Sequence, residues 1–468
     1  ALPAHHQGDA KEGGMKHLEE YRSFITAKEH SLGEGGFDRL YHNPFEKDFQ
    51  SHLIDMTVQK GRFSVFADCG LGKTLQQLVW AQNVHMKTGK PVLVLAPLSV
   101  ASQTVSEAEK FGLEAVRSKD GTIGAPIVTA NYERLHYFNP DDFGGVACDE
   151  SSILKNDKGK TRQAMTQFLS RIPYRTMFTA TPSPNDYTEL GTTSEALGGL
   201  PFMDMLEAFF VSNDNSLHPD HMGEAWRFKP HAEPHFWKGA ASWAIMIRKP
   251  SDIGFANEGF DLPELHEIRH TVDSDPRDGD MFVMPARNMV EVREERKATM
   301  EARCGAAAEL IQQHESGVMW CQFNAEADML TKMVLGAVNL SGSDKDDVKE
   351  EKFEAFRNGQ IKYLVTKPQI AAMGVNWQHC NAFTYFDDYS YEQYYQAVRR
   401  MWRYGQTRPV YGYNIGTSGL VNVTRNRAKK AEKAERMFEQ MMDHMLDAQS
   451  RAAKEYQAMK PTFPGWMK

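Results

Sequence analysis

Short apolar runs alternate with helix-like stretches in the first half of the chain. Residues 63–67 form one such run, a Gly-rich turn and a helical period over residues 74–86 follow it, and the next apolar run starts at Pro91. Short β-branched runs separated by helical periods favour a parallel sheet with helices on its faces. Further strands are predicted over residues 126–130, 145–148 and 175–179. This order predicts a first α/β domain.

The pattern loosens between Tyr187 and Arg248 and then returns. The loose stretch is rich in aromatic residues and Met, so we expect a helical protrusion with loops. Prolines and glycines after Lys249 indicate a linker. Beyond it, a charged helix over residues 286–316 precedes a second series of predicted strands, at residues 318–323, 362–366, 382–386 and 409–415. The predicted fold class is α/β, with two tandem domains, helical insertions and a C-terminal helix.

These patterns divide the chain into consecutive parts. They are an N-terminal extension (1–40), a first α/β lobe with the helical protrusion (41–250), a linker (251–265), a second α/β lobe (266–420) and a helical tail (421–468). Residues 1–14 are rich in Gly and His and precede the first Met, so they are set aside as a cloning remnant or an unstructured lead.

The tail from Thr424 to Tyr456 carries a narrow apolar seam. Its members recur at alternating spacings of four and three, and they are Ala434, Phe438, Met441, Met445, Ala448 and Ala452. Such spacing is typical of a coiled-coil seam or of a single helix packed on a domain. Because the Ala and Met positions bury little area, we expect a brace on the second domain rather than an oligomerisation coil.

Composition and charge restrict the class of protein. The chain has 468 residues and a net charge of -8, so a nucleic-acid contact would need a local basic cleft. Mean hydropathy is -0.54, and no apolar run approaches the ~18 residues of a membrane span. The first residues lack the apolar centre of a secretory signal. Five cysteines without a CxxC pair argue against a disulfide framework or a Cys-based zinc site.

We therefore expect a cytoplasmic protein in a reducing compartment, with no membrane and no disulfide-linked partner. The oligomeric state stays open at this stage.

A glycine-rich turn between the first predicted strand and helix has the chemistry of a phosphate loop. Such a loop needs small residues whose backbone N–H groups wrap phosphate oxygens, a Lys that reaches the β- and γ-phosphates, and a hydroxyl for magnesium. Gly70, Gly72, Lys73 and Thr74 supply these groups. The general pattern has a further Gly where Ala67 stands, so the match is incomplete. A chance Gly-Lys-Thr in a loop is the alternative, and the flanking strand and helix disfavour it.

A pair of adjacent carboxylates ends the predicted strand at residues 145–148. Asp149 at such a strand tip can bind the magnesium held by Thr74, and Glu150 can orient or deprotonate an attacking water. An isolated Asp-Glu pair is usually a solvated strand end. After a phosphate loop in the same sheet, it indicates a hydrolytic site.

Four motifs in register carry a resemblance to a known family. They are Asp68-Cys-Gly-Leu-Gly-Lys-Thr, Asp149-Glu-Ser-Ser-Ile-Leu-Lys-Asn156, Thr179-Ala-Thr-Pro-Ser-Pro-Asn185 and Gln396-Ala-Val-Arg-Arg-Met-Trp-Arg-Tyr-Gly-Gln406. Their order resembles that of the superfamily-two helicases. In detail they look like the Swi/Snf-type translocases, and most like the compact versions carried by bacteriophages. The resemblance runs from about Phe45 to Ile415, and Ser152 departs from it because relatives carry His there.

The resemblance implies two RecA-like P-loop domains with ATP and Mg²⁺ between them and double-stranded DNA, including forked or branched duplexes, across both. It implies that Gln50 reads the adenine edge, that Gln396 contacts the nucleotide, and that Arg400 and Arg403 are arginine fingers. A phage-encoded member would act in the host-cell cytoplasm. The resemblance also implies backbone contacts to nucleic acid from Ser99, Thr129, Asn131, Lys367 and Asn376.

For individual residues, purely structural roles remain as alternatives to the functional ones. Arg399, Arg400 and Arg403 could form a basic helix face bound to an acidic surface. The hydroxyls of Thr179 and Thr181, implied to couple nucleotide to DNA, could simply end a strand, and the polar residues implied to contact DNA could cap turns.

The function predicted from the resemblance is an ATP-dependent translocase on double-stranded DNA, with DNA-stimulated ATPase activity. Alternatives are a strand-separating DNA or RNA helicase and a nucleotide-switched DNA clamp with little turnover. A metabolic P-loop kinase would not need the second lobe. Because the net charge is -8, a DNA motor must concentrate its basic groups along the groove between the lobes.

Overall fold

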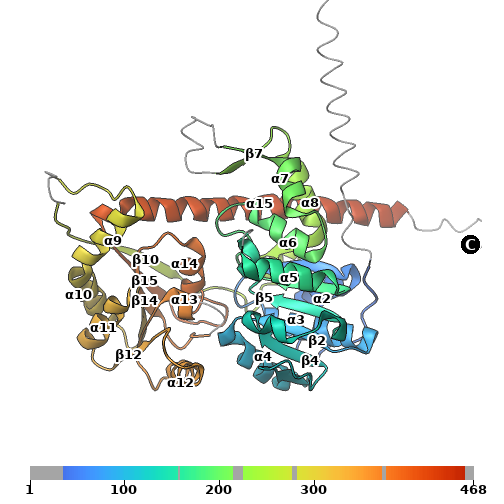
Figure 1. Cartoon of the computed structure of the whole chain (residues 1–468), viewed down its shortest axis with the longest axis horizontal. Coiled ribbons are helices and arrows are strands. Elements are labelled where there is room, and N and C mark those ends of the chain that lie inside the picture. The colour runs from blue at the N-terminus through green and yellow to red at the C-terminus, as the bar shows by residue number, and fades with distance from the viewer. Residues whose placement is uncertain (1–34, 157–158, 214–224, 277–281, 372–375, 459–468) are drawn as a thin grey trace, which may run out of the picture.

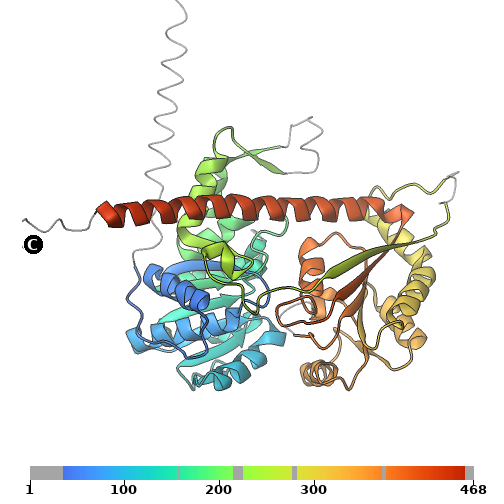
Figure 2. The ribbon, with the colours of Figure 1, turned by 180° about the vertical axis from the view of Figure 1, so that it is seen from behind.

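The computed structural model contains two α/β lobes joined by a linker and by one long helix (Figures 1 and 2). It describes residues 35–156, 159–213, 225–276, 282–371 and 376–458, and the side chains of these residues except 99, 102, 371 and 446–458. Among the described helices, none is both long enough and apolar enough to cross a membrane. The five cysteines are buried and free.

Lobe 1 is built on a seven-stranded parallel sheet with the order β3-β4-β2-β5-β6-β1-β9. Its central strands are buried along their length, as expected for a parallel sheet covered on both faces. The strands are β1 (Arg62–Ala67), β2 (Val92–Ala96), β3 (Ala115–Arg117), β4 (Ile127–Asn131), β5 (Gly145–Asp149), β6 (Tyr174–Phe178) and β9 (Ala244–Ile247).

Two of these strands, β3 and β9, were not predicted from the sequence. The four residues of β9 are all buried and pair with β1, although the surrounding sequence reads as helical. An apolar run this short has the same appearance in a strand and in a buried helix. Its position beside β1 brings residues 246–248 next to the start of the glycine-rich turn, where the N–H of Asp68 donates to the carbonyl of Ile247 at 3.0 Å.

Helices cover both faces of this sheet. One apolar cluster joins α2 and α3 to β2, and the other joins α5 to α8 to the opposite face. The helices are α2 (Asp48–Lys60), α3 (Lys73–Thr88), α4 (Leu98–Lys110), α5 (Lys160–Ser170), α6 (Glu189–Leu197), α7 (Phe202–Phe209) and α8 (Glu233–Trp243), with the short 3-10 turns η1 (Tyr132–Tyr137), η2 (Pro140–Asp142), η3 (Ser151–Lys155) and η5 (Pro250–Ile253). The expected protrusion also holds a hairpin of β7 (Phe210–Ser212) and β8 (Trp226–Phe228).

Lobe 2 is built on a six-stranded parallel sheet with the order β10-β15-β14-β11-β13-β12. Its strands are β10 (Leu265–Val272), β11 (Gly317–Trp320), β12 (Ala337–Leu340), β13 (Tyr363–Thr366), β14 (Ala382–Phe386) and β15 (Val410–Thr417). Its helices are α9 (Met289–Ala298), α10 (Met300–Ile311), α11 (Asn324–Met333), α12 (Asp346–Arg357), α13 (Pro368–Ala371) and α14 (Tyr391–Val398), followed by η6 (Ser418–Leu420). The two parallel sheets confirm the predicted α/β class with tandem RecA-like lobes.

The predicted charged helix over residues 286–316 is two helices. Thr299 ends α9 and precedes α10, and its hydroxyl donates to the carbonyl of Glu295 at 2.7 Å. This hydroxyl-to-backbone bond four residues back is typical of Thr within or at the end of helices, where it can bend the chain.

The long C-terminal helix α15 (Val421–Ala458) corrects the prediction for the tail. Its first turns pack on lobe 2, where Arg427 pairs with Asp387 at 3.2 Å. Its middle packs on lobe 1, because Met437, Met441 and Met445 are at most 5% exposed within the lobe 1 core. The expectation of a brace on the second domain alone is therefore wrong. Figure 2 shows the helix running across both lobes.

Candidate active site

The glycine-rich turn lies between β1 and α3 with the backbone of a phosphate loop. Gly70 and Gly72 have φ values of 92° and 74°, in the region that favours glycine. The loop leads directly into α3, a helix of 16 residues that begins at Lys73. The first free N–H groups of such a helix form an anion site. The ammonium of Lys73 donates to the carbonyls of Ala67 at 2.9 Å and Asp68 at 3.3 Å, so it lies over the loop.

Gln50 is held against this loop from α2. Its amide nitrogen donates to the carbonyl of Leu71 at 3.0 Å, while its oxygen accepts from the N–H of Lys47 at 2.9 Å. Gly72 lies under this amide, and a Cβ at residue 72 would collide with it. Gln50 thus supports the loop and caps α2, and its implied contact to adenine stays a prediction.

Asp149 is the last residue of β5, and Glu150 follows it at the same edge of the sheet. The Asp149 carboxylate accepts a hydrogen bond from Gln77 of α3 at 2.7 Å. Burial, with the neighbouring Glu150 adding to it, raises the pKa of Asp149 to about 6, and the positive charge of Lys73 opposes this rise. Gln77 was not predicted as a site residue, although its position four residues after Lys73 places it on the same face of α3.

These residues fit a magnesium ion. Proteins usually hold Mg²⁺ with one or two carboxylates together with phosphate oxygens and waters. Asp149 is a buried carboxylate with a raised pKa, and a cation beside it would favour its ionised form. Thr74 supplies a hydroxyl in the first turn of α3, next to Lys73. The donor set is therefore the one expected for this ion.

Glu150 has an unusual backbone conformation for a non-glycine residue. Its φ of 49° and ψ of 50° lie in the left-handed region, which residues with a Cβ rarely occupy outside functional sites. Its carboxylate accepts from the hydroxyl of Thr179 at 3.5 Å and from the amide of Gln396 at 3.4 Å. Gln396 belongs to lobe 2, so this carboxylate lies at the junction of the lobes.

Gln396 and Arg400 bring lobe 2 against the phosphate loop. The amide oxygen of Gln396 accepts from Arg400 at 2.5 Å, and the Arg400 guanidinium also lies 3.9 Å from the thiol of Cys69. Arg400 is 3% exposed. The predicted finger therefore reaches the loop between β1 and α3 from the other lobe.

Arg403 lies beside Arg400, and its side chain is partly buried. Burial and the positive charge of Arg400 lower the pKa of Arg403 to about 10. Within the described residues, its Nε has no hydrogen-bond partner. Two adjacent guanidinium groups repel one another, so an anion between the lobes would be favoured here.

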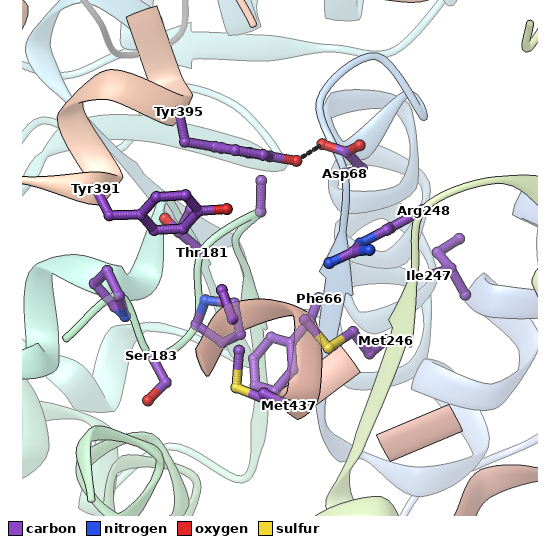
Figure 3. A pocket seen from close by; sticks show the side chains of 14 residues that line it. Phe66, Asp68, Thr181, Ser183, Met246, Ile247, Arg248, Tyr391, Tyr395 and Met437 are labelled. Atoms are coloured by element: carbon purple, nitrogen blue, oxygen red, sulfur yellow. Dashed lines mark hydrogen bonds between the residues drawn. The ribbon is translucent and has the colours of Figure 1, made fainter. Parts of the chain in front are cut away.

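A third arginine, which was not predicted as part of the site, makes a direct contact between the lobes. Arg399 pairs with Asp68 at 2.5 Å, and their side chains are 1% and 8% exposed. Tyr395 of α14 also donates its hydroxyl to Asp68, as Figure 3 shows. Both contacts join lobe 2 to the residue that begins the phosphate loop. The alternative of an arginine bound to an acidic group thus describes Arg399.

The residues implied to contact nucleic acid have diverse surroundings. Thr129 is fully buried in β4, and its hydroxyl donates to the carbonyls of Ala101 and Val116. A side-chain contact to DNA is therefore unsupported there. Asn131 donates to Glu133 at 2.7 Å. Lys367 is half-buried just after β13, and the side chain of Ser99 lies outside the described residues.

Asn376 lies in a groove between α4 of lobe 1 and α12 of lobe 2. Acidic groups outnumber basic ones in this groove, contrary to the prediction of a basic groove between the lobes. The acidic lining residues are Glu107, Glu350, Glu351 and Glu354, and the basic ones are Lys110 and Arg357. Arg117 of β3 also pairs with Glu350 across it at 2.9 Å. Phosphate groups would be repelled by this excess of carboxylates.

Comparisons with known proteins agree with this architecture. Residues 302–405 match the helicase conserved C-terminal domain, which covers most of lobe 2 including Gln396, Arg400 and Arg403. The chain is 28% identical over 173 residues to a putative protein p41 of Acyrthosiphon pisum secondary endosymbiont phage 1, covering 31% of this chain and 37% of that protein.

Eukaryotic relatives match as well. The "DNA repair and recombination protein RAD54-like" of Drosophila willistoni is 28% identical over 215 residues, covering 39% of this chain and 25% of that protein. The protein of the same description from Gallus gallus is 29% identical over 153 residues, 26% of this chain and 21% of its own length. The matched stretches thus cover well under half of each relative. Over part of its length the chain is similar to superfamily-two helicases and translocases of the Swi/Snf type, and to a phage-encoded protein.

Proposed function

We propose that this chain is an ATP-dependent translocase that couples ATP hydrolysis between its two lobes to movement on double-stranded DNA. The observation that carries the proposal is the meeting of Gln396 and Arg400 of lobe 2 with Glu150 and Cys69 of lobe 1. Residues suited to binding phosphate thus lie on one lobe, and residues suited to stabilising the departing phosphoryl charge lie on the other.

Lobe 1 would bind the nucleotide. The N–H groups of the loop around Gly70 and Gly72, with the first turn of α3, would hold the phosphates, and Lys73 would move from the carbonyls of Ala67 and Asp68 to the β- and γ-phosphates. Glu150 would orient the attacking water and accept its proton. The hydrogen bonds from Thr179 and Gln396 hold its carboxylate in place for this task.

Mg²⁺, when bound by Thr74 and Asp149, would neutralise charge on the phosphate oxygens. Gln77 would keep the Asp149 carboxylate oriented through its hydrogen bond of 2.7 Å. This arrangement assigns Asp149 to binding and Glu150 to proton transfer.

Lobe 2 would complete the site. Arg400 and Arg403 would place positive charge on the γ-phosphoryl group as it leaves, an effect worth about 10³–10⁵ in rate where arginine fingers have been removed. Because these arginines and Glu150 belong to different lobes, hydrolysis would require the lobes to be closed. Repeated closure and opening would then advance the chain along its track.

A DNA track is supported by the names of the relatives, which are described as DNA repair and recombination proteins. Contacts to the phosphate backbone would give affinity without reading sequence. The groove between α4 and α12 has an excess of carboxylates, so we expect the phosphate contacts on other surfaces, with Asn131 and Lys367 as candidates. Binding should weaken steeply with salt.

The test is ATP hydrolysis measured alone and then with duplex DNA, single-stranded DNA and RNA. Stimulation by duplex DNA only is the expected result, and stimulation by RNA alone would refute the translocase. Lys73→Ala serves as the inactive control, because it removes the ammonium from the loop without changing the lobe 2 residues.

Displacement of a third strand from an intact duplex separates translocation from strand separation. We expect triplex displacement that depends on ATP, with no opening of a plain forked duplex. Efficient opening of a fork without triplex displacement would instead support the helicase alternative.

A further inference from the structure

Arg399 is buried between the lobes and contacts two consecutive residues of the phosphate loop. Its guanidinium pairs with the Asp68 carboxylate at 2.5 Å and donates to the carbonyl of Cys69 at 3.2 Å. Three aromatic rings surround it, and they belong to Trp402 at 5.0 Å, Tyr404 at 5.7 Å and Tyr395 at 5.9 Å. The guanidinium is thus held by cation–π contacts in addition to its ion pair.

Both carboxylate oxygens of Asp68 have partners. One carboxylate oxygen pairs with Arg399, and the other accepts from the hydroxyl of Tyr395 and from the N–H of Cys69 at 2.6 Å. The carboxylate thus joins α14 of lobe 2 to the backbone just before Gly70. Favourable charge from Asp68 and neighbouring groups raises the pKa of Arg399 despite burial, so this cation stays charged.

Arg399 lies next to the predicted arginine finger, so its ion pair can affect where the finger lies. Arg399 immediately precedes Arg400, and Asp68 immediately precedes Cys69, which Arg400 approaches to 3.9 Å. The ion pair therefore sets the spacing between the arginine finger and the phosphate loop one residue away. A displacement of about 1 Å in such an arrangement can cost about 10²-fold in rate.

We propose that Arg399 is a positioning residue for ATP hydrolysis, which places Arg400 against the phosphate loop by pairing with Asp68 across the lobes. This inference rests on the proposed function. The Nη2 of Arg399 donates to both Asp68 and Cys69, so in this scheme Arg399 acts through the loop and not on the nucleotide. Its loss should therefore lower kcat and leave the KM for ATP nearly unchanged.

The experiment compares Arg399→Gln, Arg399→Lys, Asp68→Asn and the double variant Asp68→Asn/Arg399→Gln with the wild type at saturating duplex DNA. We expect Arg399→Gln to lower kcat by about 10- to 100-fold with the KM for ATP within about twofold, and with one nucleotide bound per chain. Arg399→Lys should recover part of the rate, since it keeps the charge.

The double variant keeps the test valid if a single variant folds poorly. Either single change leaves one buried charge without its partner, whereas the double change removes both. If the two residues act as a unit, the double variant should lose no more activity than Arg399→Gln alone. The matched control is Arg117→Gln, which removes another ion pair between the lobes, at 2.9 Å from Glu350 and remote from the loop.

Three results would overturn the inference. They are an unchanged kcat in Arg399→Gln, losses that multiply in the double variant, and an equal loss in Arg117→Gln, which would indicate a general effect of lobe docking. If the wild type hydrolyses ATP and any of these results is observed, only this inference is refuted. If the wild type hydrolyses no ATP with any nucleic acid, the proposed function is refuted as well.

Discussion

The amide of Gln396 in lobe 2 donates a hydrogen bond to the carboxylate of Glu150 in lobe 1 at 3.4 Å. The oxygen of the same amide accepts from Arg400 at 2.5 Å. One side chain thus connects the proposed water-activating group to the proposed finger.

Glu150→Gln should keep nucleotide binding and lose turnover. The substitution preserves the shape of the side chain but removes the proton acceptor, and general-base catalysis contributes about 10²–10⁴ in rate. Fluorescent ATP titration and a phosphate-release assay measure the two properties. Glu301→Gln, at an exposed position of α10, is the control and should behave as the wild type. Normal turnover in Glu150→Gln would refute the assignment of this residue.

Arg403→Ala should keep the affinity for ATP while hydrolysis falls by about 10³-fold or more. The reason is that its positive charge is needed mainly when the γ-phosphoryl group departs. Single-turnover hydrolysis, with the protein in excess over ATP, checks this. Arg408→Ala removes a nearby guanidinium that instead donates to the carbonyl of His379, so it should retain the wild-type rate. Equal rates in the two variants would disqualify Arg403 as a finger.

The stability of the magnesium-free protein should depend on pH through Asp149. Its pKa in the fold is about 6, above the usual 3.8, so the folded protein binds this proton more tightly than the unfolded chain does. The stabilising proton is present at low pH and is lost as the pH rises through about 6. The ionised, buried carboxylate therefore destabilises the fold at neutral pH.

Asp149→Asn removes this titration. Its Tm should exceed that of the wild type most at neutral pH, and the difference should shrink as the pH falls from about 7.5 to about 5. Thermal unfolding without metal measures the difference. The exposed Asp142→Asn is the control, and a Tm difference for Asp149→Asn that did not vary with pH would contradict the raised pKa.

Met441→Ala should destabilise the protein by about 2–5 kcal/mol, as expected for truncating a fully buried methionine. Met441 is 0% exposed where α15 packs on lobe 1. Denaturant unfolding measures the free energy change. Met289→Ala is the matched control, because Met289 is 64% exposed and its truncation should change stability by no more than about 0.5 kcal/mol. A similar small effect at Met441 would show that α15 contributes little to lobe 1.

The sequence predicted the central parts of both sheets because local pattern determines them. Strands β2 and β5 are buried on both faces, so each forms a continuous apolar run bounded by turns. The phosphate loop could also be predicted from local sequence, because Gly70, Gly72 and Lys73 lie close together in the chain. The edge strand β10 escaped prediction because most of its side chains are polar and at least partly exposed, and it pairs on one side only.

Contacts between the lobes lay beyond prediction from pattern. Asp68 and Arg399 are 331 residues apart in sequence, and each alone reads as an ordinary charged residue. The seam on α15 was visible in the spacing of Phe438, Met441 and Met445, but spacing does not tell which surface covers an apolar face. The acidic groove between α4 and α12 likewise depends on how two distant helices meet.

The long helix also restricts how the lobes can move. At about 1.5 Å rise per residue, its 38 residues make a rod about 57 Å long. This rod is attached to lobe 2 near Arg427 and to lobe 1 from Met437 to Met445, while the chain between β9 and β10 joins the lobes a second time. Because the helix and the linker both connect the lobes, we expect them to limit how far the lobes can separate during a cycle of hydrolysis.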